Sequence, residues 1–402
     1  MPSDDPRMEK LERLREMGID PWGERLDDRI RIADIRQRAE EVRFQRASDG
    51  ELIALPEVDD KNREAFREWV GEQGPGDFVG PMVRAAGRIV LQRKKGKLRF
   101  VDIRDHTGQI QLFIGRGQVG EDQWAISEQF DLGDLIAVDG QLRRTKMGEL
   151  TIFAERLHFM TKSLAPPPEK YHGLTNAELR QRMRYLDLTY GEGVMERFIA
   201  RIQIVDSIRT TLKRRRYFEV EGPTLHSIAG GAAARPFVTH HNTLDLNLFL
   251  RIALELHLKR LLVGGLDRVF ELGRVYRNEG ISVKHNPEFT MMEAYEAYGN
   301  YETMMELTEQ LIVDAIGATG GGFIRPWGDT DVDYSPPFQR ATYHTLFERH
   351  TGVDPHDESA ILELAKSIDI EVERRHIDVI KNEIFEAKVE DALLGPIFVL
   401  DY

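Results

Sequence analysis

Residues 268–298, RVFELGRVYRNEGISVKHNPEFTMMEAYEAY, place two alternating runs on either side of a polar loop. The runs suit two β-strands, and the loop suits the turn of an antiparallel pair. Side chains alternate faces along a strand, so every second residue of the later run shares one face. The pairing is predicted to gather a charged and aromatic surface, the hairpin floor, from Arg277, Glu279, Phe289, Glu293 and Tyr295. Charged groups on an otherwise apolar hairpin are costly unless they are paired or bind a ligand, so the hairpin floor is a candidate binding site.

The bulk composition excludes several classes of protein. A chain of 402 residues favours two domains over one. The net charge of -13 argues against extensive wrapping of nucleic acid but leaves room for a local basic patch. The absence of cysteine excludes disulfides and thiolate-bound metal centres. The N-terminus lacks the apolar core of a signal peptide, and no apolar run reaches the length of a membrane span, so a cytoplasmic protein without membrane contact is expected.

Residues 1–78 are predicted to form a helical N-terminal segment. Residues 7–18 carry apolar side chains at helical spacing and end at Gly18, where a helix would stop. Residues 30–72 are polar, and one side of the helix expected there carries Ile32, Ile35, Ala39 and Val42.

Residues 79–162 show the pattern of a small barrel. Five short runs with strand character are separated by Gly- and Asp-rich turns, and a helical insert is expected near residues 122–130. This arrangement suits an OB-type barrel, which binds single-stranded nucleic acid through a basic groove and stacking aromatic rings. Basic side chains surround the first turn, before Phe100: Arg88, Arg93, Lys94, Lys95, Lys97 and Arg99. A solvated hairpin with a buried Phe explains the same pattern equally well, because OB folds have other uses.

A Pro-rich stretch at residues 163–170 is predicted to be a stiff linker before a second domain, residues 171–402. In that domain, Gly231 lies in a small-residue loop that lets a ligand approach the backbone. Glu255 stands where a helix should begin, and its carboxylate either balances the helix dipole or binds an amine. Residues 340–395 give three helical patterns, and the chain ends inside an apolar run that suits a strand.

Taken together, these residues resemble the class II lysyl-tRNA synthetases from about residue 9 to residue 402, more weakly between residues 40 and 78. The most specific stretches are PPPEKYHGL, RMRYLDL, IAGGAAARPFVTHHNTLD, LHLKRLLVGG and RNEGISVKHNPEFTMMEAYEAY. The last of these resembles motif 2 of the family, and YFEVEGPTLH resembles the end of motif 1. Gly222 and Leu254 stand where the family usually has Thr and Pro, and neither departure removes a charged group.

The resemblance implies an α+β chain. It comprises a five-stranded OB-type barrel, the anticodon-binding domain, and a class II antiparallel sheet flanked by helices. The family continues past the position of Tyr402 with motif 3 and the acidic ligands of Mg²⁺. We therefore expect a sequence truncated before motif 3, with an incomplete catalytic domain and no metal ligands of its own. The adjacent His240 and His241 do not change this, because neighbours on a strand point to opposite faces.

The implied reaction is ATP-dependent activation of lysine to lysyl-adenylate, followed by transfer to tRNA(Lys). Both reacting groups are anionic, so the site must neutralise charge and fix geometry rather than supply a nucleophile. By resemblance, Arg277 bridges the lysine carboxylate and the α-phosphate, and Glu279 reads the adenine amino group; these two are the catalytic candidates. The resemblance assigns the outer phosphates to His285 and Asn286 and adenine stacking to Phe289.

The resemblance also assigns the lysine-binding groups. Gly231 and Glu255 would hold the α-amine, and Glu293 and Tyr295 would face the side-chain amine.

In the barrel, the family's anticodon contacts fall on Arg93, Phe100 and Gln111, an aromatic platform with polar groups suited to unpaired RNA bases. A homodimer is expected from the resemblance alone. Two alternatives stay open at this point: a non-catalytic tRNA-binding or regulatory protein on a truncated scaffold, and a lysyl-transferring paralogue, although such paralogues generally lack the barrel.

Overall fold

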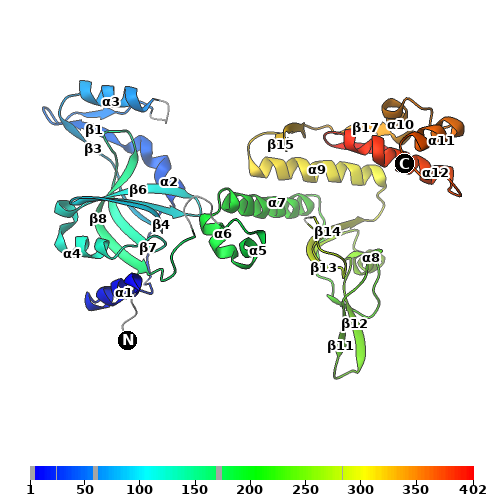
Figure 1. The fold of residues 1–402 in the computed structure, drawn as a ribbon, viewed down its shortest axis with the longest axis horizontal. Coiled ribbons are helices and arrows are strands. Elements are labelled where there is room, and N and C mark those ends of the chain that lie inside the picture. Colours follow the sequence, from blue (N-terminus) through cyan, green and yellow to red (C-terminus); the bar gives the residue numbers. More distant parts are fainter. Residues whose placement is uncertain (1–4, 24, 58–61, 169–173, 283) are drawn as a thin grey trace. The chain divides into compact units, whose positions relative to one another are not determined.

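The computed structural model describes residues 5–23, 25–57, 62–168, 174–282 and 284–402. The chain divides into two compact units, Met1–Met195 and Glu196–Tyr402, which are described separately below (Figure 1). The proposed linker at residues 163–170 stays a prediction, and its Glu169 and Lys170 lie outside the described residues. No described helix is long and apolar enough to cross a membrane.

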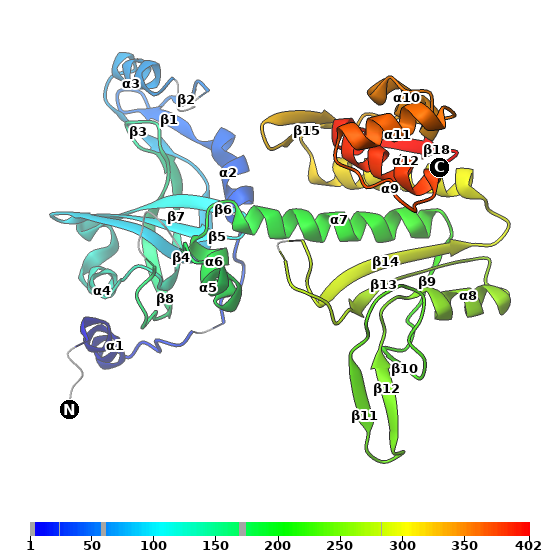
Figure 2. The same cartoon turned by 45° about the vertical axis from the view of Figure 1, so that its right-hand side comes forward.

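A closed barrel forms the middle of the first unit (Figure 2). Its strands are β4 (Met82–Lys95), β5 (Leu98–Asp105), β6 (Gly108–Gly115), β7 (Leu135–Arg144) and β8 (Leu150–Thr161). They close in the order β4-β5-β6-β8-β7, which confirms the predicted OB-type barrel. Alternate residues such as Val101, Ile103 and Leu112 fill the interior, so their neighbours face outward. Helix α4 (Arg116–Glu128) follows β6 and begins earlier than the sequence predicted.

The prediction of a helix over residues 30–72 is wrong for much of its length. The described elements are α2 (Ile32–Gln37), the 3₁₀ turn η1 (Arg38–Glu41), β1 (Arg43–Arg46), β2 (Leu52–Ala54), α3 (Arg63–Glu72) and β3 (Gly76–Val79). The three strands form one sheet in the order β2-β1-β3. Phe44 of β1 lies opposite Phe78 of β3, and both pack against Phe66 or Trp69 of α3. This aromatic cluster is built from residues distant in sequence, so helical spacing within one segment did not reveal it.

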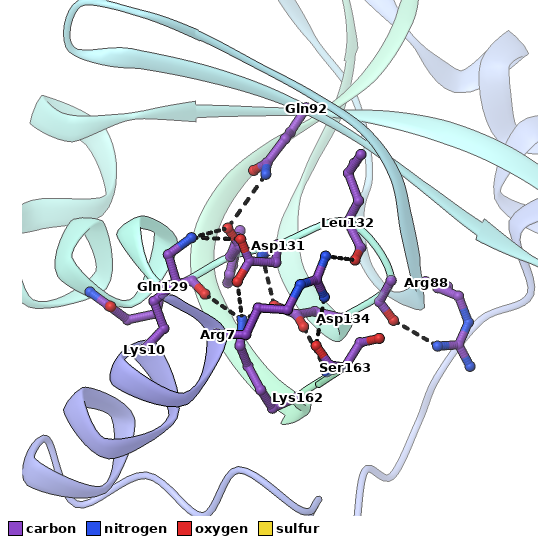
Figure 3. A network of polar contacts seen from close by, with 12 residues as sticks. Arg7, Lys10, Arg88, Gln92, Gln129, Asp131, Leu132, Asp134, Lys162 and Ser163 are labelled. Atoms are coloured by element: carbon purple, nitrogen blue, oxygen red, sulfur yellow. Dashed lines mark hydrogen bonds and ion pairs between the residues drawn. The ribbon is translucent and has the colours of Figure 1, made fainter. Parts of the chain in front are cut away.

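A polar network fixes helix α1 (Pro6–Glu16) to the barrel (Figure 3). The fully buried ammonium of Lys162 donates to Asp131 at 2.7 Å and to Asp134 at 2.8 Å. Lys10 of α1 donates to the other oxygen of Asp131 at 2.6 Å. Arg7 donates to the backbone carbonyls of Ser163, just after β8, and Leu132, just before β7. Buried charges need such partners, and here the partners tie a terminal helix to the strands.

The second unit is built on a sheet with the order β14-β13-β9. Its elements are β9 (Phe218–Glu219), β13 (Arg268–Tyr276) and β14 (Glu288–Glu296), with α7 (Val194–Arg214), α8 (Glu255–Val263) and α9 (Tyr301–Thr319). One core contains Leu212 of α7, Phe270 of β13 and Leu311 of α9. A second core, on the other face, contains Leu258 of α8 and Val269 of β13. The hairpin is therefore covered by α7 and α9 on one side and by α8 on the other (Figure 2).

The remaining elements complete the two units. The first unit ends with α5 (Ala177–Arg182) and α6 (Arg184–Tyr190). The second adds β10 (Leu225–His226), β11 (Val238–His241), β12 (Leu246–Leu250), β15 (Ile324–Trp327), β16 (Thr330–Asp333), β17 (Gln339–Thr342), α10 (Tyr343–Thr351), α11 (Glu358–Ser367), α12 (Ile377–Lys388), η2 (Glu390–Ala392) and β18 (Ile397–Leu400). Helices α10, α11 and α12 confirm the three helical patterns predicted for residues 340–395, and they bury Phe347, Ile361 and Ile384 together.

Candidate functional site

The two alternating runs form the predicted antiparallel hairpin. Strands β13 and β14 pair antiparallel from Arg268 with Glu296 to Tyr276 with Glu288. Phe289, Met291 and Tyr295 of β14 all pack against the core around α8, so they share one face as expected. The hairpin floor therefore lies on the α8 side of the sheet, but Glu279 is not part of it. Because β13 ends at Tyr276, Glu279 lies on the exposed loop that follows, and its predicted place on the floor is wrong.

Two donors hold the Glu293 carboxylate in the hairpin floor. The Tyr295 hydroxyl donates to Oε2 at 2.9 Å, and the backbone N–H of Leu254 donates to Oε1 at 2.9 Å. Leu254 is the residue before α8, so the carboxylate also caps that helix. Burial and the bond to Glu293 raise the pKa of the Tyr295 phenol, so it stays a donor at neutral pH. A carboxylate has about four acceptor positions, so Glu293 keeps room for a ligand donor.

The loop at Gly231 lies against the start of α8. Gly231 has φ +89°, and an added Cβ would lie 3.0 Å from Ala253 Cβ and 3.2 Å from Glu255 Cβ. Both the conformation and the space therefore require glycine here. Lys259, one turn along α8, places Nζ 2.5 Å from Glu255 Oε1 and 5.8 Å from the centre of the Tyr295 ring. This part of the site thus already accommodates a primary ammonium group.

Arg277 and Phe289 lie together at the other end of the hairpin floor. The Arg277 guanidinium carbon is 5.3 Å from the centre of the Phe289 ring. The Arg277 backbone N–H donates to the Pro287 carbonyl at 2.8 Å, which extends the strand pairing by one step. Both residues are half-buried.

The other three predicted ATP contacts lie on the exposed loop between the strands. The backbone N–H of Glu279 donates to the Arg277 carbonyl at 2.9 Å. His285 Nδ1 lies 2.8 Å from Ser282 Oγ, in a turn closed by two backbone hydrogen bonds between the same residues. Asn286 follows this turn and is exposed. Val283 lies outside the described residues, and within the described loop no hydrogen bond joins these three side chains to Arg277.

The sequence interpretation missed a buried ion pair beside Glu293, on the same face of the hairpin. Arg251 places a guanidinium nitrogen 2.5 Å from Glu271 Oε1, and both side chains are less than 10% exposed. The backbone N–H of Gly222 donates to the other oxygen of Glu271 at 3.0 Å. Glu271 is a charged residue inside the alternating run 269–277, and its presence there could have indicated a buried ion pair. The partner could not be read from spacing, because Arg251 follows a different strand.

The outer face of the barrel carries a row of three aromatic rings. Phe100, Phe113 and Phe153 occupy paired positions on β5, β6 and β8. Their ring centres are 5.5 and 4.7 Å apart in turn. Arg93 lies 6.0 Å from the Phe100 ring at one end, and Arg143 lies 5.2 Å from the Phe153 ring at the other. The sequence had singled out only Arg93 and Phe100 of this set.

A polar row lies beside the aromatic one. Gln111, the third predicted anticodon contact, pairs with Asp102 on β5 and Thr151 on β8. The structure thus brings Arg93, Phe100 and Gln111 to one face of the barrel, next to basic and aromatic groups suited to unpaired RNA.

The described residues do not fit a metal site of their own. Among them, no three His, Cys, Asp or Glu side chains gather where they could hold an ion.

Two family models match the chain. The model "tRNA synthetases class II (D, K and N)" covers residues 176–402, and the model "OB-fold nucleic acid binding domain" covers residues 83–159. Together with the hairpin and the barrel, they define a class II aminoacyl-tRNA synthetase domain joined to a nucleic-acid-binding OB domain.

The curated relatives narrow the class further. A lysine–tRNA ligase of Enterococcus faecalis is 43% identical over 98% of this chain and 74% of its own length. The lysine–tRNA ligases of Listeria innocua and Moorella thermoacetica are 44% and 41% identical with the same coverage. The chain belongs to the lysine–tRNA ligase family of class II synthetases. None of these findings favours the non-catalytic alternative.

Proposed function

We propose that the chain binds lysine and ATP on the hairpin floor, forms lysyl-adenylate and transfers the lysyl group to tRNA(Lys). The observation that carries this proposal is Glu293. Its carboxylate is held at 2.9 Å by the Tyr295 hydroxyl and by a backbone N–H, and both donors are neutral. A half-buried carboxylate held this way keeps its negative charge available for a cationic ligand.

The lysine subsite has two ends in this proposal. Glu293 and Tyr295 receive the side-chain ammonium, and an uncharged side chain of the same length would leave the carboxylate unpaired. Glu255 and the Gly231 loop receive the α-ammonium. Glu255 is already paired with Lys259 at 2.5 Å, so an incoming α-ammonium would share or replace that contact.

The ATP subsite lies beside it. Phe289 offers a ring face to adenine, and Arg277 offers a planar, permanently charged fork to the lysine carboxylate and the α-phosphate. Placing one cation between the two anionic reactants lowers their mutual repulsion and holds them in line. Glu279 would contact the adenine amino group, while His285 and Asn286 would contact the outer phosphates from the exposed loop. Mg²⁺ is expected from the family, and the described residues supply no site for it.

The barrel would bind the anticodon of tRNA(Lys). Phe100 would stack on an unpaired base, Gln111 would read the edge of that base, and Arg93 would neutralise a phosphate. We further infer a cytoplasmic homodimer from the family. Exposed apolar side chains on the β11–β12 hairpin, Val238 and Leu244, are consistent with a protein partner.

Lysine-dependent ATP–pyrophosphate exchange tests the proposal. Arg277→Ala should lower the exchange rate by roughly a hundredfold or more, the effect of removing one donor to developing charge. Arg274→Ala is the matched control, because Arg274 lies on β13 three residues before Arg277, with its side chain exposed and only a 3.6 Å contact to Glu288. Absent exchange in the unmodified chain, or equal loss in both variants, would contradict the proposed site.

A further inference from the structure

Four arginines line a small pocket on the face of the sheet that lies opposite the hairpin floor. The cavity has a volume of about 170 Å³. Tyr217 and Leu307 line it and also belong to the core between α7 and α9, whereas the hairpin floor faces α8. Four cations this close repel one another unless anionic groups balance their charge. The arginines come from the end of α7, from the turn that follows it and from the start of β13: Arg214, Arg215, Arg216 and Arg268.

Two of the four charges are balanced within the protein. Arg268 Nε donates to Glu296 Oε1 at 2.7 Å, and the Tyr217 hydroxyl donates to Glu296 Oε2 at 2.6 Å. Arg214 forms an ion pair with Asp314 of α9. Glu296 lines the pocket, but both of its oxygens already accept hydrogen bonds and its charge is matched by Arg268. It therefore leaves the other two arginines uncompensated.

Arg215 and Arg216 carry the two remaining charges. Within the part of the chain that the structure describes, no carboxylate forms an ion pair or a hydrogen bond with either guanidinium group. Arg215 is half-buried, and its backbone carbonyl accepts from Arg268 Nη1 at 3.2 Å. Charges that leave bulk water without a partner are costly, so these two arginines suit an anionic ligand.

The backbone of Arg216 adopts a conformation that favours glycine. Its φ is +65°, in the left-handed region where the Cβ of an L-residue crowds the backbone. Glycine would adopt this turn at the end of α7 without that strain. Because glycine would serve the fold better at this position, the retained strain indicates a use for the arginine side chain.

We propose that Arg215 and Arg216 bind one phosphate group in this pocket, a site that no part of the proposed aminoacylation uses. Planar guanidinium forks match phosphate oxygens and donate to them in pairs. A phosphate dianion would balance both uncompensated charges, whereas a carboxylate would balance only one. Thr303 in the first turn of α9 also lines the pocket, so the positive end of that helix dipole adds to the attraction. A free phosphate and a phosphate of an RNA backbone share this chemistry, so the experiment includes both sources.

The first measurement is a calorimetric titration of the full chain with inorganic phosphate, in a buffer free of other phosphates and at constant ionic strength. The unmodified chain should show saturable binding. Arg216→Gly removes one guanidinium fork and relieves the strained turn, so this variant should stay folded while its phosphate affinity falls at least roughly tenfold. Arg215→Gln removes the other charge and should lower the affinity to a similar extent.

Arg374→Gly is the matched control. Arg374 is exposed in the loop before α12 and has φ +61°, so the same replacement occurs at the same backbone conformation outside the pocket. This variant should keep the phosphate affinity of the unmodified chain. Thermal melting first confirms that each variant is folded.

Titration with tRNA(Lys) in phosphate-free buffer identifies the source of the phosphate. A lower tRNA affinity in Arg216→Gly than in Arg374→Gly would assign the pocket to a phosphate of the RNA backbone, and equal affinities would assign it to a free phosphate. Absence of saturable binding of inorganic phosphate to the unmodified chain would overturn the proposal. Equal phosphate affinity in the unmodified chain, Arg216→Gly and Arg215→Gln would overturn it as well.

Discussion

Glu271 and Glu293 face each other across the hairpin, yet their partners differ in kind. Glu271 is neutralised by Arg251 at 2.5 Å, inside the protein. Glu293 accepts from the Tyr295 hydroxyl and a backbone N–H, and no described cation forms an ion pair with it. A buried ion pair is internal structure, whereas a carboxylate held only by neutral donors can bind a cation from outside. This difference is what distinguishes the proposed ligand carboxylate from the structural one.

The sequence pattern predicted some residues of the hairpin site and missed others. Alternation along the runs placed Glu293, Tyr295 and Phe289 on one face, and the structure agrees. Their roles came from a family resemblance, and they stay proposals. Arg251 was missed because its partner lies on another strand, and spacing along a chain does not encode which distant charges meet.

Gly231→Ala should weaken lysine binding more than it weakens the fold. The new Cβ would lie 3.0 Å from Ala253 Cβ and 3.2 Å from Glu255 Cβ at a φ of +89°. The strain, about 1 kcal/mol or more, should move the loop away from Glu255. Isothermal titration with lysine should show reduced affinity. Gly280→Ala, in the open motif 2 loop where an added Cβ meets nothing within 4 Å, is the control; equal losses in both variants would count against the Gly231 subsite.

At the scale of elements, prediction succeeded where the pattern is local. The hairpin and the five barrel strands follow from alternation and turn residues, and both were confirmed. The helix prediction failed over residues 43–54 because β1 and β2 are short strands. Their packing depends on Phe66, Trp69 and Phe78, which lie outside this segment. The helical spacing of Ile32 and Ile35 correctly predicted helix α2, but that helix stops where the 3₁₀ turn η1 begins.

Lys162→Met should destabilise the first unit strongly. The Lys162 side chain is 0% exposed, and its loss would leave the buried carboxylate of Asp134 uncompensated. Breaking such a pair costs roughly 3–5 kcal/mol. Urea unfolding followed by tryptophan fluorescence would measure this, because Trp22, Trp69 and Trp124 all lie in that unit. Arg15→Met, which removes an exposed ion pair with Glu12 on α1, should cost less than about 1 kcal/mol, and similar midpoints for both variants would refute the network's role.

For the whole molecule, charge distribution matters more than net charge. The chain carries a formal charge of -13, yet the proposed RNA surface is flanked by Arg93 and Arg143. Binding of an anionic RNA should therefore depend on this local patch and weaken with added salt. The composition left room for such a patch, and the barrel register added Arg143 to the Arg93 that the resemblance had assigned to it.

Two substitutions should separate charge from stacking in this surface. Arg93→Ala should reduce the slope of log affinity against log salt by about 0.7–1, the loss of one phosphate contact. Phe100→Ala should weaken binding by roughly 1–3 kcal/mol with the slope unchanged, because stacking releases no counterions. Fluorescence titrations of tRNA(Lys) at several salt concentrations measure both. A slope change in Phe100→Ala alone would contradict the assigned roles.

The most direct test of the hairpin floor is calorimetric titration of the unmodified chain and of Glu293→Gln with lysine and with norleucine, which lacks the terminal amine. The unmodified chain should bind lysine and discriminate against norleucine. Glu293→Gln should lose roughly 1.5–3 kcal/mol of lysine affinity, the contribution of a charge-assisted hydrogen bond, and most of that discrimination. Glu288→Gln, exposed on the same strand, should behave like the unmodified chain. Equal lysine affinity in Glu293→Gln, or no preference for lysine over norleucine in the unmodified chain, would contradict the account.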